Sequence, residues 1–202
     1  MKLSVGSAVP SRTLTAVGDG APVAVPDPGA GPDRLIHLQF RRFAGCPVCH
    51  LHLRSVVRRH AEIEAAGIRE VVVFHSTAAE LREHVADFPF AVVADPGKRL
   101  YADYGVESSY QSLLSPRAWG PVVRALAHGT VELVRGRAKA PSFFPDGGRY
   151  GLPADFLIGP DGRILAAGHG EHVDDQWPVE KLLDLAREVR EGSAGRSPHA
   201  PG

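Results

Sequence analysis

Both cysteines of the 202-residue chain lie in one stretch, Leu35-Ile36-His37-Leu38-Gln39-Phe40-Arg41-Arg42-Phe43-Ala44-Gly45-Cys46-Pro47-Val48-Cys49-His50. Its apolar first part is typical of a strand, and the segment after Pro47 carries apolar residues at helical spacing with no Gly or Pro before Gly67. The cysteines therefore lie where a strand turns into a helix. Cys46 falls near the helix N-cap, Pro47 suits the first helical position, and Cys49 follows one turn later on the same side.

The position of the cysteines predicts thiol chemistry. A helix N-terminus offers unpaired N–H groups and the positive end of the helix dipole, and both favour a thiolate. Arg41 and Arg42 add positive charge, and strand alternation points them to opposite faces, so we expect one of the two to reach a sulfur atom. Cys46 is then the expected attacking thiol, and Cys49 is the buried partner that closes a disulfide onto it.

Four other interpretations of the cysteines are open. A zinc site needs two further ligands, and the tight histidine pairs on offer are His50 with His52 and His169 with His172. The run Cys-Pro-Val-Cys-His also fits the covalent haem motif, whose chemistry normally needs export, and we see no export signal. A structural disulfide over so short a loop constrains little of the unfolded chain. Two buried, inert cysteines are the plainest alternative.

Several histidines are candidates for supporting roles. His50 can tune or protonate a thiol because its pKa lies near neutrality, although a surface position on the first helical turn is the interpretation that we favour. His75 ends a predicted strand and is expected to be a capping or packed residue. His169 and His172, with acidic neighbours, have the composition of a metal site, but the intervening glycines favour a plain loop. We expect no metal and no cofactor.

The stretch Gly45-Cys46-Pro47-Val48-Cys49, between a strand and a helix, resembles the active site of the thioredoxin-fold superfamily. A second stretch, Gly151-Leu152-Pro153-Ala154-Asp155-Phe156, is similar to the segment that carries the cis-proline of that fold, followed by a β-hairpin. Together with Val5-Gly6-Ser7-Ala8-Val9-Pro10, the pattern most resembles the peroxiredoxin-like branch, the relatives of alkyl hydroperoxide reductase and thiol-specific antioxidant. The resemblance covers roughly residues 3–190 and implies that the peptide bond before Pro153 is cis and lies against the cysteines.

The expected fold class is α/β, a thioredoxin-like fold with a central mixed β-sheet flanked by helices. Strands and helices alternate through residues 34–105, which predicts parallel neighbours in the sheet. An N-terminal β-hairpin precedes them, and a hairpin and an amphipathic helix over residues 178–189 follow. Residues 106–150, with a helix expected over 116–128, form an insertion before the cis-proline strand, either a lid or partner surface or a solvated connector. We expect one domain, residues 1–191, and a disordered tail, residues 192–202.

The composition excludes several classes of function. Lysine plus arginine equals aspartate plus glutamate, 23 each, so the chain lacks the positive excess that binding to nucleic acid needs. No apolar run approaches the length of a membrane span. Two cysteines without an export signal predict a reducing compartment, where a close pair is catalytic or metal-binding more often than structural. The expected location is the cytoplasm.

Two classes of oxidoreductase fit these observations. In a peroxiredoxin-like antioxidant enzyme, Cys46 reduces a peroxide and becomes a sulfenic acid. Cys49 then condenses with this sulfenic acid to form a redox-active disulfide. In a thiol–disulfide oxidoreductase, Cys46 attacks a protein or small-molecule disulfide and Cys49 resolves the mixed intermediate. A redox-switched binding protein is a third interpretation of the cysteine pair. The implied substrate is the peroxide or the disulfide, and the implied reductant is a thioredoxin-type protein or a low-molecular-weight thiol. The resemblance also allows a homodimer.

The chain departs from the peroxiredoxin pattern in two places. Peroxiredoxins carry a proline and a threonine or serine upstream of the reactive cysteine, and here no threonine or serine lies between Phe40 and Cys46. They also carry an arginine near the later strand, for which Arg149 is the nearest candidate. Arg41 or Arg42 is therefore the candidate group for stabilising an anion at the site.

Overall fold

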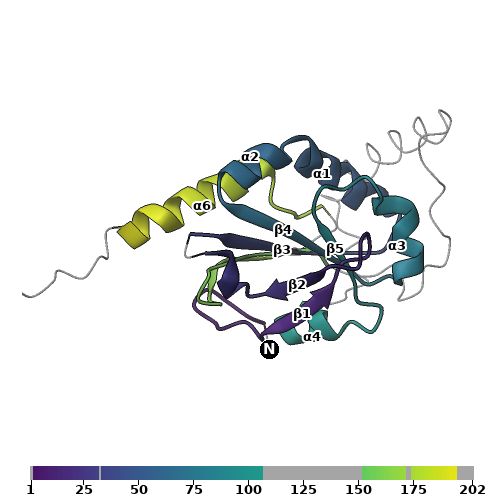
Figure 1. The fold of residues 1–202 in the computed structure, drawn as a ribbon, viewed down its shortest axis with the longest axis horizontal. Helices are drawn as coiled ribbons and strands as arrows, with labels where there is room; N and C mark the ends of the chain where they lie inside the picture. Colours follow the sequence, from purple (N-terminus) through teal and green to yellow (C-terminus); the bar gives the residue numbers. More distant parts are fainter. Residues whose placement is uncertain (1, 32, 107–151, 172–173, 195–202) are drawn as a thin grey trace, which may run out of the picture.

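The structure of the protein is a computed structural model that describes residues 2–31, 33–106, 152–171 and 174–194. A five-stranded sheet forms the centre, and a two-stranded hairpin lies beside it (Figure 1). The strands are β1 (Arg12–Thr15), β2 (Pro22–Val25), β3 (Leu35–Arg41), β4 (Ile68–Phe74), β5 (Ala91–Ala94), β6 (Ala154–Ile158) and β7 (Ile164–His169). The helices are η1 (Pro28–Ala30), α1 (Pro47–Arg58), α2 (His60–Ala65), α3 (Ala78–Val85), α4 (Arg99–Tyr104) and α6 (Val179–Ala194).

The central sheet has the strand order β5-β4-β3-β6-β7. Strands β3, β4 and β5 are parallel, whereas β6 is antiparallel to β3 and β7 is antiparallel to β6. In this register Arg41 pairs with Phe74 and Phe40 pairs with Ala154. The carboxyl ends of β3 and β4 and the start of β6 therefore meet at one edge of the sheet. This arrangement confirms the predicted mixed α/β sheet.

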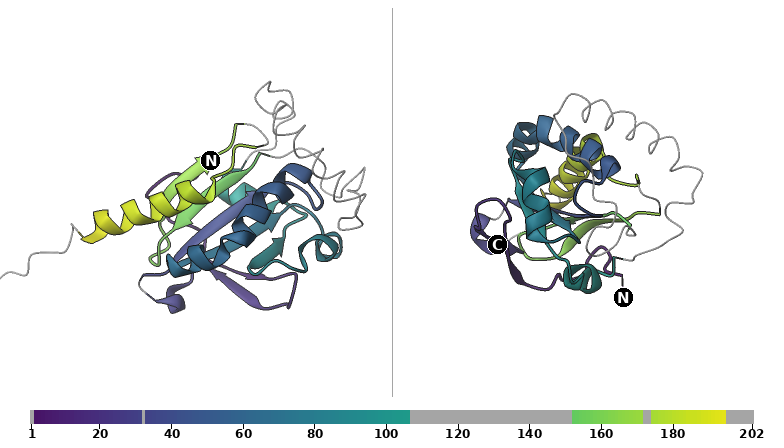
Figure 2. Two further views of the ribbon diagram at one scale, coloured as in Figure 1. Left: turned by 90° about the horizontal axis from the view of Figure 1, so that it is seen from above. Right: turned by 90° about the vertical axis from the view of Figure 1, so that its right-hand side faces the viewer.

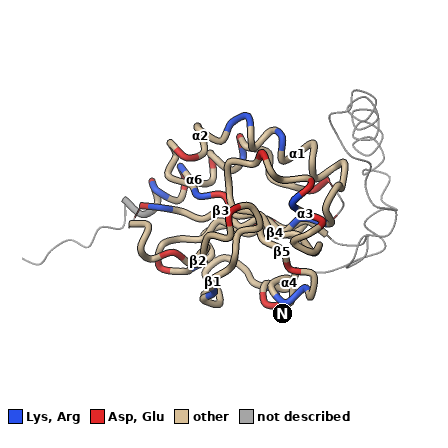
Figure 3. Tube along the Cα trace, turned by 45° about the vertical axis from the view of Figure 1, so that its right-hand side comes forward, with Lys and Arg blue, Asp and Glu red and all other residues tan. Residues whose placement is uncertain are grey.

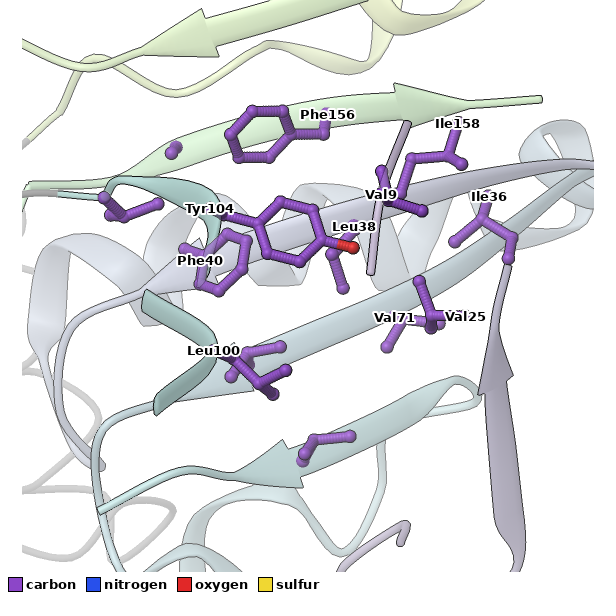
Figure 4. Close-up of a cluster of buried hydrophobic side chains, with 14 of the residues drawn as sticks. Val9, Val25, Ile36, Leu38, Phe40, Val71, Leu100, Tyr104, Phe156 and Ile158 are labelled. Carbon is purple, nitrogen blue, oxygen red and sulfur yellow. The ribbon is translucent and has the colours of Figure 1, made fainter. Parts of the chain in front are cut away.

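Helices cover the sheet on both faces (Figure 2). One face packs against α1, α2, α3 and α6 through two clusters of buried apolar side chains. The opposite face packs against α4 and the hairpin, and its centre is aromatic (Figure 4). There the Phe40 ring centroid lies 4.9 Å from that of Tyr101, 5.1 Å from that of Tyr104 and 5.8 Å from that of Phe156. Alternate residues of β3 thus anchor the strand in this core.

The predicted N-terminal hairpin is confirmed, and local residues explain where two helices begin and end. The N-terminal hairpin pairs β1 with β2 in antiparallel register. Thr77 caps α3 in a capping box with Glu80, so that each side chain bonds the backbone N–H of the other residue. Gly105 ends α4 in the left-handed conformation, with φ of 67°.

Two boundaries differ from the expectation. The helix that follows Cys46 is interrupted at Arg59, whose φ of −110° leaves the helical range, so two helices stand where one was expected. The final helix begins at Val179, close to the expected start at residue 178, and ends at Ala194, beyond the expected end at residue 189. Residues 195–202, the expected helix over 116–128 and almost all of the insertion lie outside the described residues.

Neither sign of charge dominates the described elements. Lysine and arginine are interspersed with aspartate and glutamate along the chain (Figure 3), in line with the equal totals of the sequence. Among the described helices, none combines the length and apolar character that crossing a membrane requires.

We expect Leu53→Ala to lower the free energy of unfolding by about 2–5 kcal/mol, because the side chain is fully buried between α1 and β4 and leaves a cavity. Urea denaturation measures this loss. Leu51→Ala, on the same helix at a half-buried position, is the matched control and should cost clearly less. Equal losses at the two positions would contradict the described packing of α1.

Candidate active site

The loop that carries the cysteines connects β3 to α1 at the edge where the strands end. Gly45, with φ of 72°, takes the left-handed conformation that brings the chain into the helix. Cys46 is the N-cap, and its Sγ accepts a hydrogen bond from the backbone N–H of Cys49 at 3.4 Å. Pro47 takes the first helical position, where its missing N–H leaves no bond unmade. The predicted strand–turn–helix is thereby confirmed.

The two thiols are in direct contact. Both cysteines are free, and their Sγ atoms lie 2.8 Å apart. Cys46 is 2% exposed and Cys49 is 1% exposed, and they form a small apolar cluster with Phe43 and Val48. This geometry requires only a short movement to close a disulfide.

The two thiols titrate as a pair because they share a hydrogen bond. Burial acts to raise the pKa of Cys49, but the hydrogen bond to Cys46 and the charge and backbone N–H of Arg42 outweigh it and bring the pKa down to about 7. Burial and the hydrogen bond to Cys49 raise the pKa of Cys46 well above its ordinary value. The expectation of a lowered pKa at Cys46 is therefore not met in the reduced pair. One negative charge forms between the sulfurs near neutral pH.

The structure separates the two arginines that the sequence placed side by side. Arg42 extends its Nη1 to 3.9 Å from the Sγ of Cys46, and its guanidinium lies 5.4 Å from the centre of the Phe43 ring. Arg41 is fully buried and lies against His52 of α1, and its charge adds a smaller effect that lowers the pKa of Cys49. Arg42 is therefore the arginine that reaches a sulfur atom.

Arg41 belongs to a buried polar network. Its Nη2 donates to Asp155 Oδ1 at 2.6 Å and to Gln39 Oε1, and it lies 3.3 Å from Nε2 of His52. Asp155 sits near the start of β6 and also accepts the backbone N–H of Trp177 at 3.2 Å. The ion pair between Arg41 and Asp155 therefore joins β3, which leads into the cysteine loop, to β6, which follows Pro153.

His37 and Glu70 complete this network. The Nδ1 of His37 lies 2.9 Å from Glu70 Oε2, and its Nε2 lies 3.1 Å from Asp155 Oδ1. Burial acts to lower the pKa of His37, but the charge of Glu70 and hydrogen bonds to both carboxylates raise it to about 9. Burial acts to raise the pKa of Asp155, but the Arg41 charge and the His37 hydrogen bond hold it well below its usual range. Two positive and two negative groups thus balance inside the core.

Sequence reasoning missed this network, although it left a signal. The strand 35–41 alternates apolar residues with His37, Gln39 and Arg41, and such polar alternation normally marks a solvent face. Here helices cover that face, so its polar side chains need buried partners. Glu70 and Asp155 supply them from the two neighbouring strands.

Pro153 has a different conformation from the one that the resemblance implies. It directly precedes β6, and its carbonyl accepts the N–H of Gly170 at 2.9 Å. Within the described residues the only cis peptide bond is Val25–Pro26, so the bond between Leu152 and Pro153 is trans and the expected cis-proline is wrong. The carbonyl bond to Gly170 ties this segment to the end of β7.

The remaining candidates make their described side-chain contacts with other groups than the sulfurs. His50 packs its ring 5.6 Å from that of Phe88, and burial, followed by the charge of Arg54, lowers its pKa. His169 bonds the carbonyl of Leu3 through Nε2 at 2.9 Å, and His172 lies outside the described residues. No group of three or more metal-ligating side chains is gathered in the part of the chain that the structure describes.

The sequence matches a family model, described as AhpC/TSA antioxidant enzyme, over residues 55–172, which is more than half of the chain. The chain belongs to this family. The matched region of this AhpC/TSA protein begins after Cys49, so the match speaks for the family and not for the use of the cysteines. No protein among the curated sequences matches the chain.

Solved structures share the fold of this AhpC/TSA protein at low identity. The peroxidoxin BcpB of Mycobacterium tuberculosis is 15% identical with a TM-score of 0.64, covering 93% of this chain and 99% of that chain. A peroxiredoxin 6 mutant of Arenicola marina is 13% identical with a TM-score of 0.66, covering 95% and 75%. A protein of Chlorobium tepidum, described as a DsbE-type thiol:disulfide interchange protein, is 18% identical with a TM-score of 0.58, covering 93% and 99%. These likenesses confirm the thioredoxin-like fold.

We expect Arg42→Gln to raise the pH at which the first thiolate of the pair forms, by about 1 unit, because a positive charge beside a sulfur favours the anion. The ultraviolet absorbance of the thiolate, followed during a pH titration of reduced protein, measures this shift. Arg54→Gln, on α1 at a site without a sulfur contact, is the control. An unchanged titration in Arg42→Gln would show that the guanidinium does not act on the pair.

The network predicts a pH dependence of stability. Because folding raises the pKa of His37 to about 9, its contribution is complete below the unfolded value near 6.5 and is lost as the pH rises to about 9. The expected loss is about 3 kcal/mol in the free energy of unfolding, measured by urea denaturation. A Cys46→Ala/Cys49→Ala background removes the thiols, which titrate in the same range. A His37 ring that loses its proton below pH 7 by NMR would refute the prediction.

Proposed function

We propose that the protein reduces peroxides through Cys46, with Cys49 as the resolving thiol. The observation that carries this proposal is the contact of the two buried sulfurs at 2.8 Å beside the Arg42 guanidinium. The pair has a readily formed anion, a positive group next to Cys46, and a second thiol already in place. These are the parts that a two-cysteine reduction needs.

The reaction balances with these residues alone and one external reductant. The Cys46 thiolate attacks the terminal oxygen of a hydroperoxide, so that an S–O bond forms, the O–O bond breaks, and an alkoxide or hydroxide leaves and takes up a proton. The sulfenic acid of Cys46 then condenses with the Cys49 thiol to give a disulfide and water. A dithiol protein of the thioredoxin type, or two low-molecular-weight thiols, returns two electrons and two protons by exchange.

The shared proton reconciles the pKa values with Cys46 as the nucleophile. The proton has to cross only the 2.8 Å between the sulfurs, so a charge that forms at Cys49 can pass to Cys46. Cys46 is the N-cap residue and is the sulfur that Arg42 reaches. A negative charge transferred there is stabilised as the reaction begins.

Burial of the pair favours a small substrate. With exposures of 2% and 1%, the sulfurs are more accessible to a peroxide than to a disulfide held in another folded protein. Family membership supports the same choice, as do the structural neighbours that are a peroxidoxin and peroxiredoxins. A reducing compartment such as the cytoplasm suits a pair that must be returned to the dithiol form.

Thiol–disulfide exchange is the second candidate function. It is favoured by one observation: no threonine or serine lies between Phe40 and Cys46 to orient a peroxide. A neighbour of the same fold is described as an interchange protein. In this reaction Cys46 attacks a disulfide and Cys49 displaces the mixed intermediate, so the same two sulfurs act on a different substrate.

We expect hydrogen peroxide to oxidise the reduced protein to a Cys46–Cys49 disulfide much faster than it oxidises an ordinary free thiol. Stopped-flow kinetics and intact-mass analysis measure the rate and the product. In Cys49→Ser the reaction should stop at a sulfenic acid that a dimedone probe captures, because the resolving thiol is absent.

Cys46→Ser is the matched control and should lose the fast phase entirely. A trapped sulfenic acid in Cys46→Ser, and none in Cys49→Ser, would reverse the roles of the two cysteines. Oxidation no faster than that of glutathione would reject peroxide reduction. Fast reduction of a small disulfide by the same protein would then establish the exchange reaction instead.

A further inference from the structure

Phe43 packs with the cysteines and with the guanidinium that acts on them. Its side chain is 6% exposed and belongs to one apolar cluster with Cys46 and Cys49, and its carbonyl accepts the N–H of Cys46 at 3.2 Å. The guanidinium carbon of Arg42 lies over the same ring, 5.4 Å from its centroid, and Nη1 of Arg42 lies 3.9 Å from Cys46 Sγ. The guanidinium is therefore next to an aromatic face and a sulfur atom at the same time.

Hydrogen bonds hold the backbone on both sides of Phe43. The carbonyl of Arg42 accepts the N–H of His75 at 3.1 Å, and the N–H of Ala44 donates to Ser76 Oγ at 2.9 Å. Both partners belong to the segment that directly follows β4. The backbone that carries the Phe43 ring and the Arg42 side chain is therefore fixed against the sheet.

The aromatic face favours one position of the Arg42 side chain. Arg42 is 5% exposed, so its charge has lost most of its contact with water. A cation over an aromatic ring is attracted by the negative face of the ring, and the attraction is stronger where the groups are desolvated. An arginine side chain has several rotatable bonds, and holding it in one place costs their freedom. The ring offsets this cost for the position in which the guanidinium lies beside Cys46.

We propose that the Phe43 ring positions the Arg42 guanidinium against Cys46 Sγ and thereby favours the anion that the two sulfurs share. The use of this anion in catalysis rests on the peroxide reduction proposed above. Phe43 is a positioning residue in this proposal, because it acts on the sulfurs through Arg42. Its effect on the sulfurs should therefore disappear when the charge of Arg42 is removed.

A role of Phe43 in excluding water alone would have the opposite sign. Burial acts to raise the pKa of both thiols, and Phe43 is part of the cluster that buries them. If the ring only excluded water, a smaller side chain would hydrate the sulfurs, and the thiolate would form at a lower pH. Loss of the contact with Arg42 instead moves thiolate formation to a higher pH. The direction of the shift therefore distinguishes the two roles.

A double-mutant cycle between Phe43 and Arg42 tests the proposal. Phe43→Leu removes the aromatic face and keeps an apolar side chain, and Phe43→Tyr keeps the ring. Each is made in the wild-type protein and in Arg42→Gln, and the thiolate absorbance of the reduced protein is followed during a pH titration. We expect Phe43→Leu to raise the midpoint by about 0.5 unit when Arg42 is present and not to raise it in Arg42→Gln. Phe43→Tyr should stay close to the parent protein.

Val48→Ala is the matched control for this cycle. Val48 belongs to the same cluster and is 6% exposed, as Phe43 is, but its side chain has no aromatic face. Its effect on the midpoint should be the same with and without Arg42. Arg41 and Tyr101, which also interact with the charge of Cys49, stay in place in every variant. A shift in Phe43→Leu that is equal in the two backgrounds overturns the proposal, and so does a lowered midpoint with Arg42 present.

The reaction with hydrogen peroxide separates this proposal from the one on which it rests. At pH 6, below the ionisation of the pair, a raised midpoint lowers the fraction of thiolate, although the thiolate that remains is a slightly stronger nucleophile. We therefore expect Phe43→Leu to slow the reaction about twofold at this pH, and only when Arg42 is present. A wild type no faster than a free thiol overturns peroxide reduction, and the titration cycle still decides the role of Phe43.

A measurement on the native ring covers the case in which Phe43→Leu does not fold. Protons held over an aromatic face are shifted upfield in NMR spectra, so the Cδ and Nε protons of Arg42 should appear upfield of their ordinary positions in the wild-type protein. Their disappearance in Arg42→Gln assigns these signals. Arg42 signals at ordinary positions overturn the proposal, because the guanidinium is then not held over the ring.

Discussion

Asp155 and Arg41 meet beneath the central strand, where neither side chain reaches solvent. Their ion pair joins β3, which leads into the cysteine loop, to β6, its antiparallel neighbour. Asp155 also accepts the backbone N–H of Trp177, and the Trp177 ring stacks on His37 with centroids 5.8 Å apart and planes within 6°. One carboxylate therefore fixes three segments that are distant in the sequence, and the loop that holds the sulfurs is built on one of them.

Burying such a network of charged groups in the core costs free energy. Removing an ion from water costs several kcal/mol in practice, and apolar replacements of buried pairs are often as stable, so the network is poor support for stability alone. Removing one member is a different matter, because its partner is left buried and unpaired, at a cost of about 3–5 kcal/mol. The network therefore fixes the position of the Arg41 side chain, because its neighbours His37, Glu70 and Gln39 are also paired.

The sequence predicted the fold and part of the site, and the reasons are physical. Strand–turn–helix patterns depend on nearby residues, so the N-cap at Cys46 and Pro47 at the first turn could be predicted from local spacing. The contact of the two sulfurs followed from helical geometry in the same way. The pairing of His37 with Glu70, and of Arg41 with Asp155, depends on which strands become neighbours, and the antiparallel placement of β6 beside β3 carries no local signal.

Two expectations about the site were wrong: the bond at Leu152–Pro153 is trans, and the pKa of Cys46 is raised. They show a second limit of what the sequence can predict. A resemblance transfers the place of a residue more safely than its conformation, which depends on the contacts of this particular chain. A helix N-terminus does favour a thiolate, but the argument took Cys46 alone. Once a second thiol lies 2.8 Å away and both are buried, the proton belongs to the pair, and the helix dipole no longer decides which sulfur keeps it.

Strand alternation gives the dipeptide Arg41-Arg42 its two separate duties. The first guanidinium turns into the core and pairs with Asp155, and it has a smaller effect than Arg42 on the pKa of Cys49. The second turns toward Cys46 and acts on the sulfurs and on the His75 ring. Because both belong to one backbone segment, the buried pair holds the backbone from which Arg42 extends. A fixed cation beside a buried pair of thiols is preorganised for the charge that develops in the reaction, and the rigidity of that cation originates in the core.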